Sequence, residues 1–176
     1  MRILPGLLAV LVVAGGIFTA SPAGAVGPCT GVGVTASGVY YGTCVGDLGG
    51  GSVMWSNDGS TVSMKAEAHP TPHDAVSWWE TNGPLPAGTT LVCFDLNVSS
   101  LNLLAGATAK QVLIISYNNQ QQSGQTWSVT RGSISRCGII PGGVSNIWAQ
   151  VLTVVTAARP GGSGYLTQTL VGLRVA

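Results

Sequence analysis

Apolar and polar residues alternate with a period of two along most of the chain beyond residue 26. The clearest case is the segment 60–68, where one face carries Val62, Met64, Ala66 and Ala68 and the other face is polar. Alternation of this kind is typical of a β-strand with one buried face, because successive side chains point to opposite sides. Amphipathic helical periodicity is hard to find. The pattern therefore predicts an all-β protein.

Turn residues divide this pattern into short strands. Strands are expected at 32–35, 38–45, 52–56, 60–68, 75–80, 89–98, 111–117, 126–133, 147–156 and 165–175. Asn57-Asp58-Gly59 predicts a hairpin with a type I′ turn. Loops are expected at 69–73, 82–88, 118–124 and 137–145. Many strands with regular turn signals predict an antiparallel β-sandwich of jelly-roll or immunoglobulin-like type.

The first 25 residues have a different pattern. Arg2 precedes an apolar run from Ile3 to Phe18, and Ala23-Gly24-Ala25 supplies the small residues of a cleavage site. These features predict a secretory signal peptide over residues 1–25, followed by a single sandwich domain over 26–176. The protein is therefore expected to be secreted and extracellular. The segment after residue 25 holds no apolar stretch of 18 residues, so we expect no membrane span there.

The four cysteines, Cys29, Cys44, Cys93 and Cys137, predict two disulfide bonds in an oxidising compartment. The sequence alone allows three pairings. We favour Cys29–Cys44, which closes a hairpin-sized loop, and Cys93–Cys137, which ties two strands of the main sheet. A four-cysteine zinc site is the alternative, but no C-x-x-C spacing is present.

The chain is poor in charge. Charged residues make up 7% of it and the formal net charge is +1, whereas a typical domain is about 25% charged. Nucleic acids and anionic membranes bind clusters of Lys and Arg, so neither is an expected partner.

Glu67 and Glu80 are the best candidates for a catalytic pair, because each lies near the end of a predicted strand and close to tryptophans. A glycoside hydrolase needs two carboxyl groups that face one cleft. The alternative is that both are ordinary solvated side chains, and Lys65 accompanies Glu67 on its face. No G-x-S-x-G motif is present, and both histidines lie in one proline-rich loop. We therefore favour a protein without catalytic activity.

Metal ligands are few in this sequence. His69, His73 and Asp74 have the chemistry of a zinc or copper site, but two prolines place them on an extended loop without an evident further ligand. The hard ligands for calcium are Asp47, Asp58 and Asp95. We assign no metal and no cofactor.

Aromatic residues are the most informative candidates for ligand binding. In an extended segment Trp78 and Trp79 point to opposite faces, so at most one lies in the core and the other is exposed or lies in a groove. Tyr40 and Tyr41 present the same choice, whereas Trp127 and Trp148 are expected in the core. Indole rings stack on the apolar face of sugars, and amide groups bond to sugar hydroxyls. The predicted ligand-binding residues are Trp78, Trp79, Tyr41, Asn118 and Asn119.

The layout from Trp78 to the end of the chain looks like that of jelly-roll carbohydrate-binding modules. It has a tryptophan, a Leu-Pro-x-Gly turn at 85–88, a strand, and a long terminal strand containing Val171-Gly172-Leu173. The sequence thus predicts a secreted, non-catalytic domain that binds a polysaccharide or glycan. The alternatives are a structural, cell-surface or protein-binding (inhibitor-like) protein and, less favoured, a small glycoside hydrolase using Glu67 and Glu80.

Overall fold

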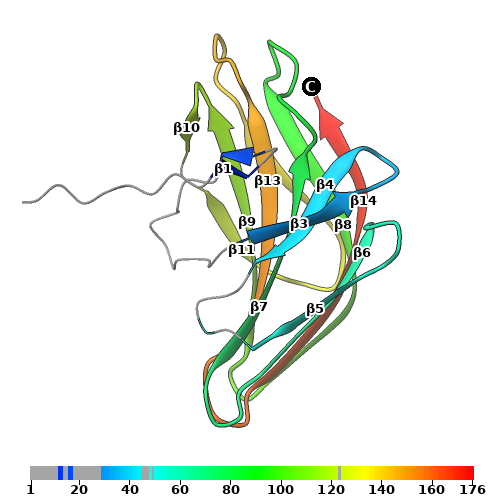
Figure 1. Ribbon diagram of the computed structural model, residues 1–176, viewed down its shortest axis with the longest axis vertical. Helices are drawn as coiled ribbons and strands as arrows, with labels where there is room; N and C mark the ends of the chain where they lie inside the picture. Colours follow the sequence, from blue (N-terminus) through cyan, green and yellow to red (C-terminus); the bar gives the residue numbers. More distant parts are fainter. Residues whose placement is uncertain (1–11, 14–15, 18–28, 45–47, 49, 123) are drawn as a thin grey trace, which may run out of the picture.

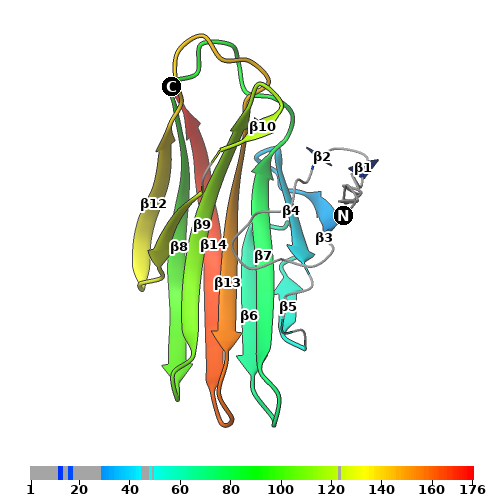
Figure 2. The same cartoon turned by 90° about the vertical axis from the view of Figure 1, so that its left-hand side faces the viewer.

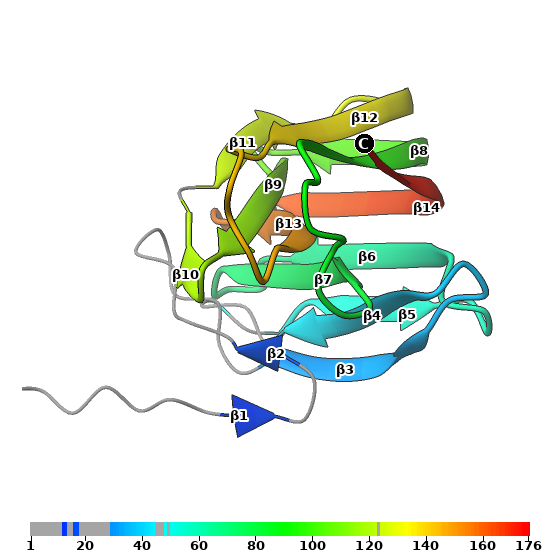
Figure 3. The same cartoon turned by 90° about the horizontal axis from the view of Figure 1, so that it is seen from above.

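Two antiparallel sheets pack face to face and form a β-sandwich (Figures 1 and 3). The computed structural model describes residues 29–44, 48, 50–122 and 124–176, together with the backbone of 12–13 and 16–17. Most of the long strands run along the long axis of the molecule (Figure 2). The predicted fold class, an antiparallel β-sandwich with two disulfides, is confirmed.

One layer is a seven-stranded sheet with the order β10-β9-β13-β7-β4-β3, in which β11 pairs with β9. Its strands are β3 (Cys29–Val34), β4 (Val39–Cys44), β7 (His73–Thr81), β9 (Thr108–Tyr117), β10 (Gln120–Gln121), β11 (Gln125–Ser128) and β13 (Trp148–Ala157).

The other layer is a five-stranded sheet with the order β12-β8-β14-β6-β5. Its strands are β5 (Ser52–Trp55), β6 (Thr61–Glu67), β8 (Leu91–Leu104), β12 (Gly132–Ile139) and β14 (Ser163–Val175). Two short strands, β1 (Val12–Val13) and β2 (Gly16–Ile17), pair with each other. Apart from these four residues, the predicted signal peptide at 1–25 lies outside the described residues.

The core lies between the two sheets and follows the alternation of the sequence. On β6 the side chains of Val62, Met64 and Ala66 are fully buried, whereas Lys65 between them is exposed. On β8 the core residues from Val92 to Val98 alternate in the same way, although Cys93 on the outer face is also buried. Period-two burial of this kind is what allows each sheet to have one core face and one outer face.

The predicted strand 126–133 is wrong, because the chain changes sheets in the middle of it. β11 ends at Ser128 in the seven-stranded sheet, and β12 begins at Gly132 in the five-stranded sheet. Gly132 has a φ of 100°, a conformation open to glycine but strained for other residues. Beside it, the Arg131 guanidinium donates two hydrogen bonds to the carbonyl of Leu101, at 2.7 and 3.2 Å. β12 then extends into the segment expected to be irregular.

The hairpin between β5 and β6 is confirmed, but its turn is not type I′. Of Asn57, Asp58 and Gly59, only Gly59 has a positive φ, and its N–H donates to the carbonyl of Ser56. The Asp58 carboxylate accepts hydrogen bonds from the hydroxyls of Ser56 and Ser60. These bonds lower the pKa of Asp58 to about 2. Asp58 therefore closes a turn, and among the described residues it belongs to no cluster of metal-ligating side chains.

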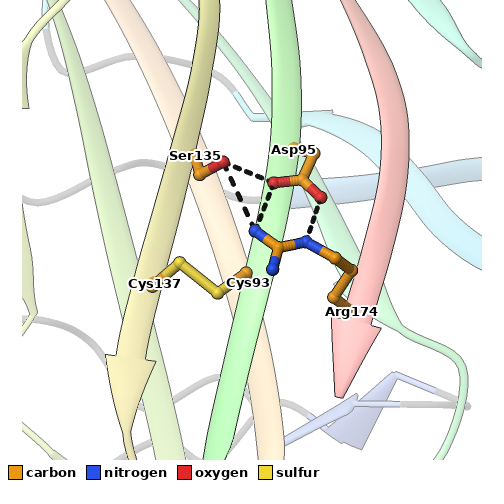
Figure 4. The surroundings of a disulfide bond; sticks show 5 residues. All are labelled: Cys93, Asp95, Ser135, Cys137 and Arg174. Carbon is orange, nitrogen blue, oxygen red and sulfur yellow. Dashed lines mark hydrogen bonds and ion pairs between the residues drawn. A yellow bond between two sulfur atoms is a disulfide. The ribbon is translucent and has the colours of Figure 1, made fainter. Parts of the chain in front are cut away.

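Both predicted disulfides are present, each between directly opposed residues of neighbouring strands. Cys29–Cys44 joins β3 to β4, and Cys93–Cys137 joins β8 to β12. Figure 4 shows the second bond beside the ion pair of Asp95 with Arg174. Two disulfides are consistent with an extracellular protein.

A chain of hydrogen bonds, the polar belt, crosses the core from one sheet to the other. It consists of Arg136, Gln111, Gln168 and Thr153. Arg136 Nε donates to Gln111 Oε1 at 2.7 Å, and Gln111 Nε2 donates to Gln168 Oε1 at 2.8 Å. Gln168 Nε2 donates to the Thr153 hydroxyl at 2.7 Å. Both glutamines are fully buried, so each amide meets the requirement for a partner in the interior.

Candidate functional site

The outer face of the seven-stranded sheet carries aromatic, aliphatic and amide side chains, and we call it the aromatic face. Its strands β4, β7, β13 and β9 lie side by side in this order (Figure 2). The side chains alternate along these strands with core residues. The aromatic face comprises Tyr40, Trp78, Glu80, Val112, Ile114, Trp148, Gln150 and Leu152.

Strand register arranges these residues in rows across the sheet. Glu80 pairs with Tyr40 on one side and with Gln150 on the other. In the next row Trp78 pairs with Gly42 and Leu152. Adjacent strands are about 4.8 Å apart, so the side chains within a row are in reach of one ligand.

Trp78 lies across its neighbouring strand. A Cβ atom added at Gly42 would come within 2.5 Å of the indole, so glycine at this position makes room for the ring. Trp78 is 4% exposed and forms a cluster with Cys44, Val76 and Leu152 that is separate from the main core. Trp78 therefore lies beneath the aromatic face, where partly buried side chains such as Tyr40 and Ile114 pack against its cluster.

Trp78 and Trp79 point to opposite faces of β7 as expected, but both are buried, so the expectation that only one of them is buried is wrong. Trp79 is fully buried in the main core, where its indole N–H donates to the Gly59 carbonyl and its ring meets Trp55 edge to face. Tyr41, the predicted tyrosine of the site, is 7% exposed and packs on Trp55 at 4.7 Å between ring centroids. Both faces of β7 bury an indole, because the sheet has apolar clusters on both sides.

Trp148, which was expected in the core, is instead partly exposed on the aromatic face. Its neighbours Ile147 and Ala149 are buried, and Trp148 pairs with Ser116 of β9. A sequence signal for this placement exists, since alternation groups Trp148 with the polar Gln150. Trp127 is also only partly buried, and the guanidinium of Arg136 lies over its ring at 4.9 Å from the centroid.

Asn118 and Asn119, predicted to bind ligand from a loop, form the turn between β9 and β10. Their φ values of 52° and 59° are those of a type I′ turn. The Asn118 side-chain oxygen accepts a hydrogen bond from the Ser145 N–H at 2.8 Å, and the Asn119 oxygen accepts one from Asn146. Both side chains are thus used to join two loops, near the end of the aromatic face that carries Trp148.

Glu80 is the charged residue at the centre of the aromatic face. Its side chain is partly buried, and burial raises the pKa of its carboxyl group to about 7. Among the described residues, no side chain forms a hydrogen bond or ion pair with it. A carboxyl group in this setting is present in both protonation states near neutral pH.

Glu67 lies on the opposite side of the molecule. It is on the outer face of the five-stranded sheet, where it forms an ion pair with Lys65 at 3.0 Å. The core of the sandwich therefore separates the two glutamates. A glycosidase pair of Glu67 and Glu80, with both carboxyl groups in one cleft, is excluded by this arrangement.

The outer face of the five-stranded sheet is rich in hydroxyl groups, and we call it the hydroxyl face. Thr61 bonds to Thr169 at 2.9 Å and Ser63 bonds to Thr167 at 3.0 Å, so hydroxyls join neighbouring strands. Figure 4 shows Arg174 forming two hydrogen bonds with Asp95, which also accepts one from Ser135. Arg174 lowers the pKa of Asp95. The hydroxyl groups of these Ser and Thr residues and the Asp95 carboxylate thus bond to one another or to Arg174.

Predicted metal ligands do not converge in the described part of the chain. No group of three or more His, Cys, Asp or Glu side chains suited to a metal ion occurs there. His73 bonds weakly to the Thr71 hydroxyl at 3.3 Å, and Asp95 is engaged by Arg174. Asp47 lies outside the described residues. Within the same described ranges, no helix has the length and apolar character of a membrane span.

The sandwich resembles several solved structures in outline. No protein-family model matches the sequence, and a search of curated proteins finds no significant match. A carbohydrate-binding module, TmCBM61, solved in complex with β-1,4-galactotriose, is 15% identical with a TM-score of 0.37, covering 81% of this chain and 91% of that one. At this TM-score the likeness assigns neither a family nor a ligand.

Two further solved structures have comparable scores. The enzymatically active domain of bacteriophage CBA120 tailspike protein 4 is 12% identical with a TM-score of 0.38, covering 81% of this chain and 19% of that one. A chain from the structure of accessory secretory protein 1, 2 and 3 in Streptococcus pneumoniae is 11% identical with a TM-score of 0.35, covering 72% of this chain and 89% of that one.

Proposed function

We propose that this protein is a secreted, non-catalytic carbohydrate-binding domain and that the aromatic face is its binding surface. The observation that carries the proposal is the row of Tyr40, Glu80 and Gln150 on three adjacent strands, with Trp148 next to it. Aromatic rings stack on the apolar face of a sugar, while amide and carboxyl groups bond to its hydroxyls. On the hydroxyl face, by contrast, the carboxylates of Glu67 and Asp95 are already paired with Lys65 and Arg174.

Pull-down of the purified protein with a panel of insoluble polysaccharides, read alongside tryptophan fluorescence, tests this proposal. Ligand that covers Trp148 is expected to shift the emission. Trp148→Ala and Tyr40→Ala are each expected to weaken binding about tenfold, as loss of a contacting aromatic ring does.

Tyr165→Ala is the matched control for Tyr40→Ala. Tyr165 is 38% exposed, but it lies on the hydroxyl face, on the other side of the sandwich. Its replacement leaves affinity unchanged under the proposal. Absence of binding to every polysaccharide, or equal losses in the two tyrosine variants, would reject the aromatic face as a glycan site.

A protein-binding role is the second candidate, and the edges of the sheets favour it. β3 and β12 each end the strand order of a sheet, and each exposes a large apolar side chain, Val32 at 52% and Ile139 at 82%. An open edge can pair with a strand of another chain. Light scattering that shows self-association, together with no polysaccharide binding, would favour this role over the first.

A further inference from the structure

Among the described residues of the aromatic face, the neighbours of Glu80 on adjacent strands are uncharged. The side chains paired with it on β4 and β13 are Tyr40 and Gln150, and Ile114 of β9 follows in the same row. None of these carries a positive charge at neutral pH. Lys110 is the cation that β9 contributes to this face, four residues before Ile114. Strand geometry places its backbone about 16 Å from that of Glu80.

The other charges are also remote from Glu80. Asp74, on the same face of β7, is six residues away, which is about 20 Å along a strand. Lys65 and Arg174 belong to the hydroxyl face, where each already has a carboxylate partner. Within the described residues, the aromatic face thus combines a carboxyl group without a cationic partner and the partly exposed rings of Tyr40 and Trp148.

We propose that Glu80 makes the aromatic face selective for glycans that carry free amino groups, such as polymers of glucosamine. An ammonium group on the sugar supplies the positive partner that the carboxylate lacks. A charge-assisted hydrogen bond is stronger than a neutral one, and aromatic rings attract a cation placed over them. Acetylation removes the positive charge, and a uronic acid places a second carboxylate beside Glu80. This inference rests on the function proposed above and names its ligand class.

Proton linkage gives the proposal a second signature. The pKa of Glu80 is about 7 in the free protein. An ammonium group favours the ionised carboxylate, so binding below pH 7 releases the proton of Glu80. Affinity for the amino glycan is therefore expected to rise with pH, by up to about tenfold between pH 5 and pH 6. Affinity for an acetylated glycan lacks this rise, because an uncharged ligand only buries the carboxyl group further.

Calorimetry with the glucosamine hexamer and the N-acetylglucosamine hexamer tests both signatures. At pH 6 the protein is expected to bind the first at least about tenfold more tightly, the effect of one charge-assisted bond. Glu80→Gln is expected to remove this preference and the pH dependence together. Glu67→Gln, which alters a carboxylate on the opposite face, is the matched control and leaves both unchanged.

The outcomes separate the two proposals. Equal affinity for the two hexamers, or a preference that survives Glu80→Gln, overturns the selectivity and leaves glycan binding intact. If neither hexamer binds but another polysaccharide does, the selectivity is again wrong. If nothing on the polysaccharide panel binds, the proposed function itself fails.

Discussion

The two outer faces of this sandwich differ although both belong to antiparallel sheets on one core. The aromatic face gathers apolar side chains that bury one another, and it leaves the carboxyl group of Glu80 without a partner among the described residues. On the hydroxyl face, Ser and Thr bond across strands and Asp95 is held by Arg174. A face whose polar groups are satisfied gains little from a ligand, whereas an apolar face with an unpaired polar group gains from one. The contrast is why we place the binding function on the aromatic face.

Removal of the disulfides, one in each sheet, is the largest expected perturbation. Cys93–Cys137 spans 44 residues and Cys29–Cys44 spans 15. By loop entropy, replacing the first pair with alanine lowers the free energy of unfolding by about 4 kcal/mol and replacing the second by about 3 kcal/mol. Urea unfolding of the two double variants measures the difference. A larger loss from the Cys29–Cys44 pair would mean that native packing around β3, rather than loop length, dominates.

Leucine and threonine at matched positions provide a direct comparison of the two faces. Leu152 on the aromatic face is 7% exposed, whereas Thr167 on the hydroxyl face is half-buried and bonds to Ser63. Leu152→Ala is expected to cost about 2–3 kcal/mol through lost burial. Thr167→Ala is expected to cost about 1 kcal/mol, because it removes hydrogen bonds to Ser63 and Tyr165 on the outer face but little apolar burial. Similar losses of stability in thermal unfolding would show that apolar burial on the aromatic face contributes no more than the hydrogen bonds of the hydroxyl face.

Carboxyl groups on the two faces predict opposite pH dependence of stability. Glu80 has its pKa raised from 4.5 to about 7 by burial. Below pH 4.5 the carboxyl group is protonated in both the folded and the unfolded protein, so its burial carries no penalty for charge. As pH rises through 7, this contribution is lost and the free energy of unfolding falls by on the order of 2 kcal/mol. Glu80→Gln should therefore raise stability at pH 8 and leave it unchanged at pH 4.

Asp95 supplies the contrast to Glu80. Its pKa is lowered by Arg174, so its contribution is present at neutral pH and is lost under acid conditions. Chemical denaturation of Glu80→Gln and Asp95→Asn across pH measures both effects. If Glu80→Gln changes stability equally at pH 4 and pH 8, burial of its carboxyl group is not the cause.

The turn between β9 and β10 is expected to give an effect of similar small size. Asn118 has a φ of 52°, which costs about 1 kcal/mol for residues other than glycine and asparagine. Asn118→Ala is expected to be destabilising by about 1–2 kcal/mol, because it also removes the acceptor for Ser145. Asn118→Gly keeps the conformation and loses only the acceptor, so it should lie between wild type and alanine in thermal unfolding. Identical losses for the two variants would assign the whole effect to the hydrogen bond.

Alternation predicted the strands because each has one face against the core, as on β6, and cysteine spacing predicted the disulfides. The alternation could not show which indole of β7 faces outward, because apolar residues occupy both faces of that strand. Val76 and Trp78 form the outer cluster while Ala75 and Trp79 enter the core. The change of sheets after Ser128 was also beyond the pattern, because Val129 remains apolar and buried across the junction. The side chains that surround Glu80 come from β4 and β13. Which strands lie beside β7 depends on the order of strands in the sheet, and the sequence pattern does not predict this order.

The polar belt has a consequence for how the chain avoids misfolding. Gln111 is opposite Thr153 in the native register of β9 and β13. A slip of two residues would keep every apolar side chain in the interior, yet it would place Gln111 opposite Val151 or Val155 and away from Gln168. Hydrophobic burial alone does not distinguish these alignments, but an amide stranded in the interior costs about 1–3 kcal/mol. The hydrogen bonds of the belt thus favour the native register over alignments shifted by two residues.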